Sequence, residues 1–288
     1  MKEHIEHLLD FQRVTVGSNL YELIEYYSSL NKDFGIISNS IYDNKEKWKY
    51  AGDLESKLFR IYYANESIIR ISKGYQTNLR DQRIEIFDVF SVYSLSRQQI
   101  ETFLTCYHLY FEGVSEDERE FRNLTYKLNG ILRQLELVSH IVNTDKRKQG
   151  LLSEHEQVLS LLKESAIYKG ADIDLRRKYE NPKHALIEKK SVLMEKSGLG
   201  RIQQSWKLYS NYVHSEYISD RQYNVFFRDK TGLIESICTT LNSNCRLISK
   251  LIQLLSERFN YINQLYLELS ETQKLRIDLW NRSSEALK

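Results

Sequence analysis

Residues 115–144, SEDEREFRNLTYKLNGILRQLELVSHIVNT, set the fold class of this chain. Apolar side chains recur in this stretch at steps of three and four, namely Phe121, Leu124, Leu128, Ile131, Leu135, Val138 and Val142. This spacing is typical of one face of an amphipathic helix, and Ser115 with Glu118 forms a capping box at its start. We therefore predict a long helix, in which Gly130 indicates either a tolerated break or a close contact with another helix.

The same spacing recurs along most of the chain. It predicts further helices over 18–30, 52–72, 153–167, 200–218 and 231–268. Ser153 and Glu156 form a second capping box at the start of one of them. At about 1.5 Å per residue the last helix would be more than about 50 Å long. We expect it to span the molecule or to project as a dimerisation arm.

The breaks in this pattern are few and define the expected architecture. One proline and 11 glycines leave little room for turns, and no stretch alternates strictly for long enough to predict strands. We predict an all-α fold, a multi-helix antiparallel bundle of roughly eight helices with one very long C-terminal helix. Residues 1–145 would form an N-terminal helical bundle and 146–200 a basic connecting region. Residues 201–288 would add C-terminal helices that pack on the first bundle as one globular unit.

Composition excludes several classes of protein. A net charge of +2, from 41 basic and 39 acidic residues, gives no overall attraction to nucleic acid or membrane. No window offers about 20 apolar residues in a row, and the charged N-terminus does not resemble a signal peptide. Cys106, Cys238 and Cys245 match neither a metal site nor a disulfide framework, and His4 with His7 is read as a solvated helix face. We expect a soluble, cytoplasmic protein without membrane contact, metal or cofactor.

The most basic part of the chain lies between Lys163 and Arg201, with ten Lys or Arg against six Asp or Glu. Two interpretations stay open for it. It is a solvated helix with a connecting loop, or it is a surface that contacts the phosphates of RNA. In the second case the contacting side chains would be Arg176, Arg177, Lys178 and Lys183.

Residues 84–113, IEIFDVFSVYSLSRQQIETFLTCYHLYFEG, place charges where apolar side chains are expected. If this segment is one helix, Arg97, Glu101 and His108 fall inside its apolar stripe. Burying a charge without a partner costs several kcal/mol, so Arg97 and Glu101 should meet each other and a third polar group from a neighbouring helix. Either they form an ion pair that fixes helix register, or they line a polar pocket in which Arg97 holds an anionic group. His108 is then a hydrogen-bonded core residue or a secondary site residue.

The helix over 200–218 carries YSNYVHSEY, residues 209–217. Its apolar stripe is Ile202, Trp206, Tyr209, Val213 and Tyr217. Ser210 and His214 lie one turn apart on the shoulder of this stripe, where they can form a hydrogen bond. A helical serine lacks an oxyanion pocket of its own, so we do not interpret the two as a nucleophile pair. We expect His214 to form a polar wall of the pocket opposite Arg97 and Glu101.

Two segments, SRQQIETFLTCYHLYFE (96–112) and LYSNYVHSEY (208–217), resemble paired motifs of uncharacterised bacterial all-helical proteins. Those proteins are loosely similar to the HEPN superfamily of helical bundles, many of which are metal-independent ribonucleases in toxin-antitoxin and anti-phage systems. The superfamily motif is an Arg followed after four to six residues by a His on one helix. Arg122 has no such histidine after it, and Pro182 would break a helix between Arg177 and His184. The resemblance implies the fold more directly than the activity.

These observations predict a helical-bundle binding protein with a polar inter-helix pocket, a candidate component of a bacterial defence or toxin system. Its partner would be another protein or its own copy, bound through the long helices. The alternative is a HEPN-like ribonuclease or phosphodiesterase that uses the same pocket. His214 would then be the general acid or base, and Arg97 would stabilise a phosphate in the transition state.

Overall fold

The computed structural model describes residues 8–9, 11–15, 19–79, 82–139, 145–213, 217, 220–221, 225 and 229–285. Helices dominate these residues, and their strands are confined to one two-stranded hairpin, so the all-α class is confirmed. The described residues form more helices than the sequence predicted, because one predicted helix is divided and short helices occupy the basic region. Within these ranges no helix is both long enough and apolar enough to cross a bilayer.

The chain divides into two compact units. Unit 1 comprises the described residues up to Cys106 and from Met194 onward, and unit 2 comprises those from Tyr107 to Leu193. These limits differ from the boundaries at 145 and 200 that composition indicated. The elements before the second unit are α2 (Leu20–Asp43), the 3-10 turn η1 (Lys45–Lys47), α3 (Ala51–Ser72), β1 (Tyr75–Leu79), β2 (Gln82–Ile86) and α4 (Val89–Cys106).

The remaining elements follow in chain order. Unit 2 contains the π-helical segment η2 (Tyr107–Phe111), α5 (Glu116–Val138), α6 (Asp145–Glu164), α7 (Ala166–Gly170) and α8 (Ile173–Glu180). The short helix α9 (Lys190–Lys196) contains the boundary between the units. Unit 1 then resumes with α10 (Ile202–Val213), α12 (Lys230–Arg258), α13 (Asn260–Glu268) and α14 (Glu271–Glu285).

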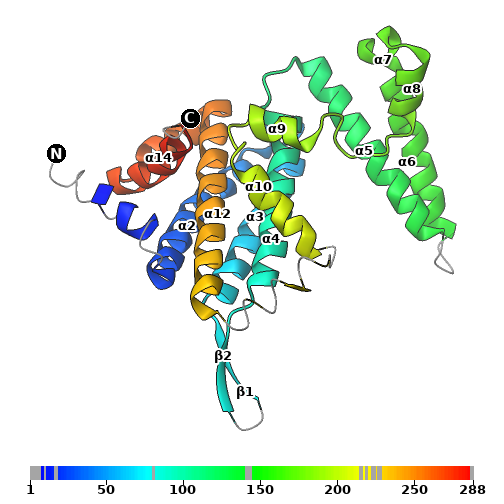
Figure 1. Cartoon of the computed structure of the whole chain (residues 1–288). Coiled ribbons are helices and arrows are strands. Elements are labelled where there is room, and N and C mark those ends of the chain that lie inside the picture. Colours follow the sequence, from blue (N-terminus) through cyan, green and yellow to red (C-terminus); the bar gives the residue numbers. More distant parts are fainter. Residues whose placement is uncertain are drawn as a thin grey trace. The chain divides into compact units, whose positions relative to one another are not determined.

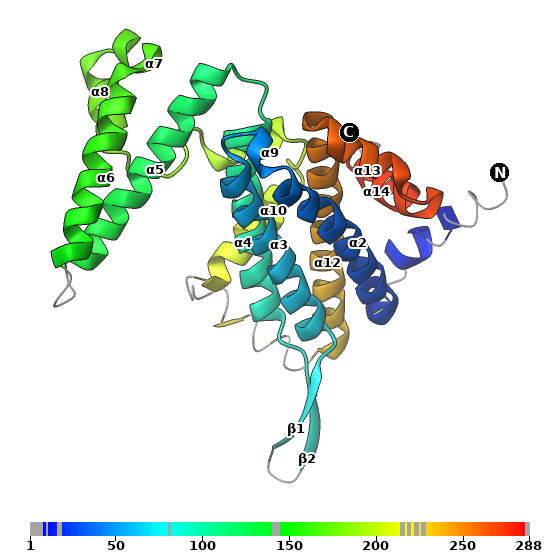
Figure 2. The same ribbon diagram turned by 180° about the vertical axis from the view of Figure 1, so that it is seen from behind.

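Unit 1 is built on four helices, α2, α3, α4 and α12, that pack side by side. Figure 1 shows α12 against α2 and α4, and Figure 2, seen from behind, brings α3 into view beside α4. The helices α10 and α14 pack on α4 and α12, respectively. Fully buried apolar side chains fill the space between the four helices, among them Leu30, Phe34, Leu58, Phe103 and Leu251. This core is what the helical spacing of the sequence predicts.

Polar side chains cross the centre of this bundle. Asn65 of α3 donates to Asn31 Oδ1 of α2 at 2.6 Å. The Asn65 Oδ1 atom accepts hydrogen bonds from Tyr27 of α2 and Gln99 of α4. All four side chains are buried. Because a buried polar group is costly unless it is paired, these bonds hold α2, α3 and α4 in one register.

The prediction of one helix over 84–113 is wrong at its start. Residues 82–86 form β2, which pairs with β1 in an antiparallel hairpin. Gly74 enters the hairpin with φ 70°, a conformation that glycine adopts without strain. Helix α4 begins only at Val89, where the side chain of Asp88 accepts from the N–H of Ser91 at 3.0 Å. Strands of five residues with one turn are too short to produce a recognisable alternation.

The prediction of a very long C-terminal helix is also wrong. Helix α12 ends at Arg258, and Phe259 has extended backbone angles, φ −124° and ψ 114°, before α13 begins. The Phe259 ring packs edge-on against Trp48, with 5.3 Å between ring centroids. The extended residue therefore ends α12 and lets an aromatic contact form. At 29 residues α12 is still the longest helix in the described ranges.

Unit 2 is centred on the hairpin of α5 and α6. Ser115 caps α5 as predicted, because its Oγ accepts from the N–H of Glu118 at 3.2 Å. The predicted stripe of α5 faces α6, although Val142 lies outside the described residues. The core of the unit consists of Phe121, Leu124, Leu128, Ile131, Val138, Leu151, Val158 and Leu162.

Two local predictions for unit 2 concern the start of α6 and the surroundings of Gly130. Helix α6 begins at Asp145, so the predicted start at Ser153 is wrong. The polar run before Ser153 continues the helix because most of its residues favour helical backbone. A Cβ added to Gly130 would meet no atom within 4 Å. Gly130 is therefore a tolerated break and not a close helix contact.

Candidate functional site

Arg97 and Glu101 form an ion pair on α4 of unit 1. Arg97 Nε donates to Glu101 Oε1 at 3.3 Å, and the two side chains are 17 % and 33 % exposed. Trp206 of α10 donates from its indole Nε1 to the same carboxylate oxygen at 3.3 Å. The two charges thus meet each other and a third polar group from a neighbouring helix, as the sequence predicted. The indole N–H joins α10 to the ion pair.

Aromatic rings fill the rest of the contact between α4 and α10. Tyr93 stacks on Tyr209 with centroids 4.7 Å apart, and Tyr212 packs against Phe90 at 5.0 Å. The Tyr209 hydroxyl donates to Thr240 at 3.1 Å, and burial raises the pKa of Tyr209 to about 12. These tyrosines are packing residues with neutral hydroxyls. The predicted stripe of α10 is incomplete at its end, because Val213 and Tyr217 are exposed.

His214, the third member of the predicted pocket, lies outside the described residues. Ser210, its predicted neighbour, donates from Oγ to the backbone oxygen of Trp206 at 2.9 Å. This hydrogen bond keeps the hydroxyl on its own helix, where it supports α10. The pocket with Arg97 and Glu101 on one wall and His214 on the other therefore remains a prediction.

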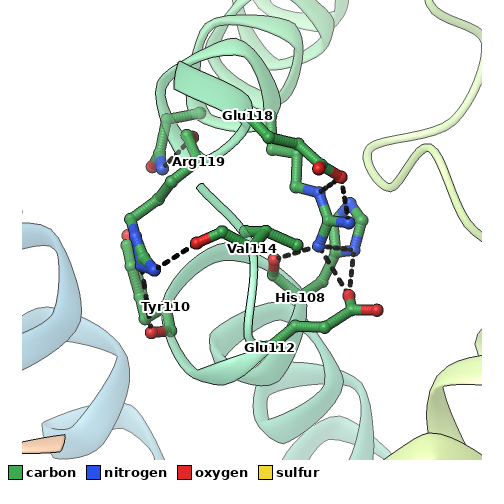
Figure 3. Close-up of polar contacts among 8 residues, drawn as sticks. His108, Tyr110, Glu112, Val114, Glu118 and Arg119 are labelled. Atoms are coloured by element: carbon green, nitrogen blue, oxygen red, sulfur yellow. Dashed lines mark hydrogen bonds and ion pairs between the residues drawn. The ribbon is translucent and has the colours of Figure 1, made fainter. Parts of the chain in front are cut away.

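Unit 2 contains a second charged cluster, to which His108, Glu112 and Glu118 belong (Figure 3). Its centre is the buried Arg122 of α5. The Arg122 Nη1 atom donates to Glu112 Oε2 at 2.5 Å and to the backbone oxygen of His108 at 2.9 Å. Its Nε and Nη2 atoms donate to Glu118 Oε1 at 3.1 and 2.5 Å. One guanidinium thus joins η2, the segment after it and the first turn of α5.

His108 is the titratable group at the centre of this cluster. Its Nδ1 lies 3.2 Å from Arg122 Nη1 and 3.5 Å from Glu112 Oε2. Burial lowers the pKa of His108 to about 4, with a further lowering by the charge of Arg122 and a partial opposing effect of Glu112. The imidazole is therefore neutral at pH 7. Since a guanidinium can only donate, a hydrogen bond from Arg122 requires Nδ1 as the acceptor and the proton on Nε2, which has no hydrogen-bond partner among the described residues.

Three groups in this cluster have the chemistry of metal ligands. His108, Glu112 and Glu188 each offer one ligand atom, and these atoms lie within 4.8 Å of one another. Imidazole and carboxylate together suit a divalent ion such as zinc. The Arg122 guanidinium, however, is 2.5 Å from Glu112 and already supplies a positive charge to this carboxylate. A metal ion would have to displace the guanidinium, so we interpret the cluster as an ionic network.

The sequence did not predict that Arg122 and Arg119 are buried or that they form a cluster. Arg119 donates to the backbone oxygens of Tyr110 at 3.4 Å and Val114 at 3.3 Å. Both arginines therefore bind the turn between η2 and α5. The available signal was the spacing of Glu118 and Arg122, four residues apart on a helix, which predicts a pair.

The basic residues predicted to contact RNA have differing surroundings in unit 2. Arg176 donates to the backbone oxygens of Tyr168 and Lys169 at 3.1 and 2.5 Å, so its guanidinium supports the turn between α7 and α8. Arg177, Lys178 and Lys183 are exposed. Arg177 lies 4.0 Å from Asp174. RNA contact by these residues remains a prediction.

A comparison of this chain with protein-family models, curated proteins and solved structures found no match. The similarity to HEPN proteins therefore remains a prediction from two short motifs.

Proposed function

We propose that this helical, cytoplasmic protein acts by binding a protein, and that its partner is a second copy of the same chain. The observation that carries the proposal is the set of exposed apolar side chains in unit 2. Ile173, at the start of α8, is 69 % exposed, and Leu161 of α6 is 53 % exposed. Further exposed apolar side chains of unit 2 are Leu137, Leu152, Leu175 and Ile187.

The thin core of unit 2 supports this proposal. Helix α8 contributes no buried residue, and α6 contributes Leu151, Val158 and Leu162. Small units with such cores commonly gain stability by association. Burying one exposed Leu or Ile side chain contributes about 1.5–3 kcal/mol. In a two-fold dimer each such residue is buried twice, because both copies present the same surface.

The contacts at the two charged sites favour binding over catalysis. A ribonuclease would need the Arg97 guanidinium to hold a phosphate, and Arg97 is bonded to Glu101. In the His108–Arg122 cluster, the Arg122 guanidinium is already bonded to Glu112 and Glu118. We propose that the charged side chains between α4 and α10 form a structural ion pair, which holds these two helices together.

Sedimentation equilibrium from about 1 µM to about 100 µM tests the association. We expect a dimer for the natural chain and a monomer for the double variant Ile173→Lys, Leu161→Lys. The matched control is Ile36→Lys, which changes an exposed isoleucine of unit 1 and should leave the dimer intact. A natural chain that stays monomeric throughout, or a double variant that still dimerises, would overturn the proposal.

An assay with labelled RNA addresses the alternative function. The natural chain, Arg97→Ala and His214→Ala should all leave the RNA at the background rate. Cleavage by the natural chain that is lost in either variant would replace the binding proposal with the ribonuclease.

A further inference from the structure

Three cationic side chains of unit 1 gather where α12 faces the turn before α10. Arg246 and Lys250 lie four residues apart, and thus on one face of α12. The turn contains Gly198, with φ 79°, and a Cβ placed on Gly198 would lie 3.9 Å from Lys250 Cε. Arg201 follows Gly198 by three residues in the same turn. The two cations of α12 therefore lie beside the turn that carries Arg201.

None of these three cations forms an ion pair with a described residue, whereas Arg97, Arg122 and Arg276 all do. Lys250 donates to the neutral amide of Gln253 at 3.2 Å. The nearby acid Glu195 packs its Cγ 3.7 Å from the position of a Cβ on Gly200 and does not pair with the cations. Like charges held together without a counter-charge repel each other. An anion bound between them would relieve this repulsion.

The Arg246 guanidinium is partly buried, and one of its donor atoms is unpaired in the described part of the chain. It lies over the Trp280 ring, 5.9 Å from the centroid, and is partly withdrawn from solvent. Its Nε atom is buried without a hydrogen-bond partner among the described residues. Burial, followed by the charge of Arg201, lowers the pKa of Arg246. A buried donor that lacks an acceptor costs about 1–3 kcal/mol, and more when it is charged.

We propose that Arg201, Arg246 and Lys250 form a binding site for a phosphate group. A guanidinium binds two oxygens of a phosphate at once, and an ammonium adds a compact positive charge. Arg201 also immediately precedes the 12-residue helix α10, whose N-terminus carries a partial positive charge. The ligand class is inorganic phosphate or a small phosphate monoester. This proposal is independent of the proposed dimer.

Isothermal titration of the full chain in a chloride buffer tests the site, with inorganic phosphate and adenosine monophosphate as probes. We expect binding of both, weakened at least tenfold in Arg246→Met and in Arg201→Gln. Equal affinity for both probes would identify the phosphate group alone as the ligand. Tighter binding of the monophosphate would identify an organic monoester. Either result supports the site.

The matched control is Arg258→Met. Arg258 lies on the same helix and over a tryptophan in the same way, 5.8 Å from the Trp48 centroid. This variant should bind both probes as tightly as the natural chain. Arg201 is exposed, so Arg201→Gln keeps the test informative if Arg246→Met does not fold. Unchanged affinity in Arg201→Gln, or no binding of either probe up to about 10 mM, would overturn the proposal.

Discussion

Replacing Arg122 with Met tests whether the buried ionic network holds unit 2 together. The Arg122 side chain is 9 % exposed, and its partner Glu112 is 11 % exposed. Met retains much of the buried stem but removes all five donors, so Glu112 is left charged and buried without its closest partner. Removing one member of a buried pair costs about 3–5 kcal/mol. Glu118 is 41 % exposed and regains water, so we expect a value at the lower end, about 3 kcal/mol.

The assay must report on unit 2 by itself. All three tryptophans, Trp48, Trp206 and Trp280, belong to unit 1, so their fluorescence does not follow the unfolding of unit 2. Hydrogen exchange of the α5 amides, measured by mass spectrometry, reports the local opening directly. A loss of about 3 kcal/mol accelerates exchange through local opening roughly a hundredfold.

A second arginine on α5 provides the control for this experiment. Arg133 pairs with Glu136, but both side chains are more than half exposed. Exposed pairs contribute about 0–1 kcal/mol, so Arg133→Met should change the exchange rates by about fivefold or less. If Arg122→Met has as small an effect as Arg133→Met, the cluster does not hold η2 and α5 together, and the reasoning fails.

Two further predictions concern the same unit. Burial and Arg122 lower the pKa of His108 to about 4, below its usual value of about 6.5, so the unfolded chain binds a proton more readily than the folded one. The contribution of His108 to the free energy of unfolding is then complete above pH 6.5 and decreases by up to about 3 kcal/mol as the pH falls toward 4. Hydrogen exchange of α5, measured as a function of pH, should lose this pH dependence in His108→Gln. An unchanged pH dependence in the variant would assign the effect to other groups. Gly130→Ala should stabilise α5 by about 1 kcal/mol, because nothing lies near the added Cβ, and faster exchange of α5 would contradict this expectation.

Local regularities explain what the sequence predicted correctly. The stripe from Phe121 to Val138 and the cap at Ser115 depend only on residues a few positions apart on one helix. The same is true of Arg97 and Glu101, whose spacing of four residues already places them together. The breaks at Phe259 and before Val89 depend on contacts with distant residues and on short strands. Helical spacing alone therefore predicted single helices where the structure has separate elements.

The candidate sites show the same division between local and distant information. The sequence identified the residues of the ion pair on α4, but it could not show that Trp206 of α10 donates to Glu101, more than a hundred residues earlier. It treated His108 and Arg122 as unrelated, because fourteen residues separate them. The turn after η2 brings them within hydrogen-bond distance. Such turns have no period, and single-sequence patterns do not predict them.

By itself, the sequence determined that this chain is helical and which face of most helices is apolar. Only the tertiary structure decided which faces meet. It buried Asn31, Asn65 and Gln99 against one another and brought His108 within hydrogen-bond distance of Arg122. The physical reason is that the helical period gives only the direction in which a side chain points around the axis of its own helix. Which residue of another helix this side chain contacts depends on how the two helices pack, and the packing is set by the whole core.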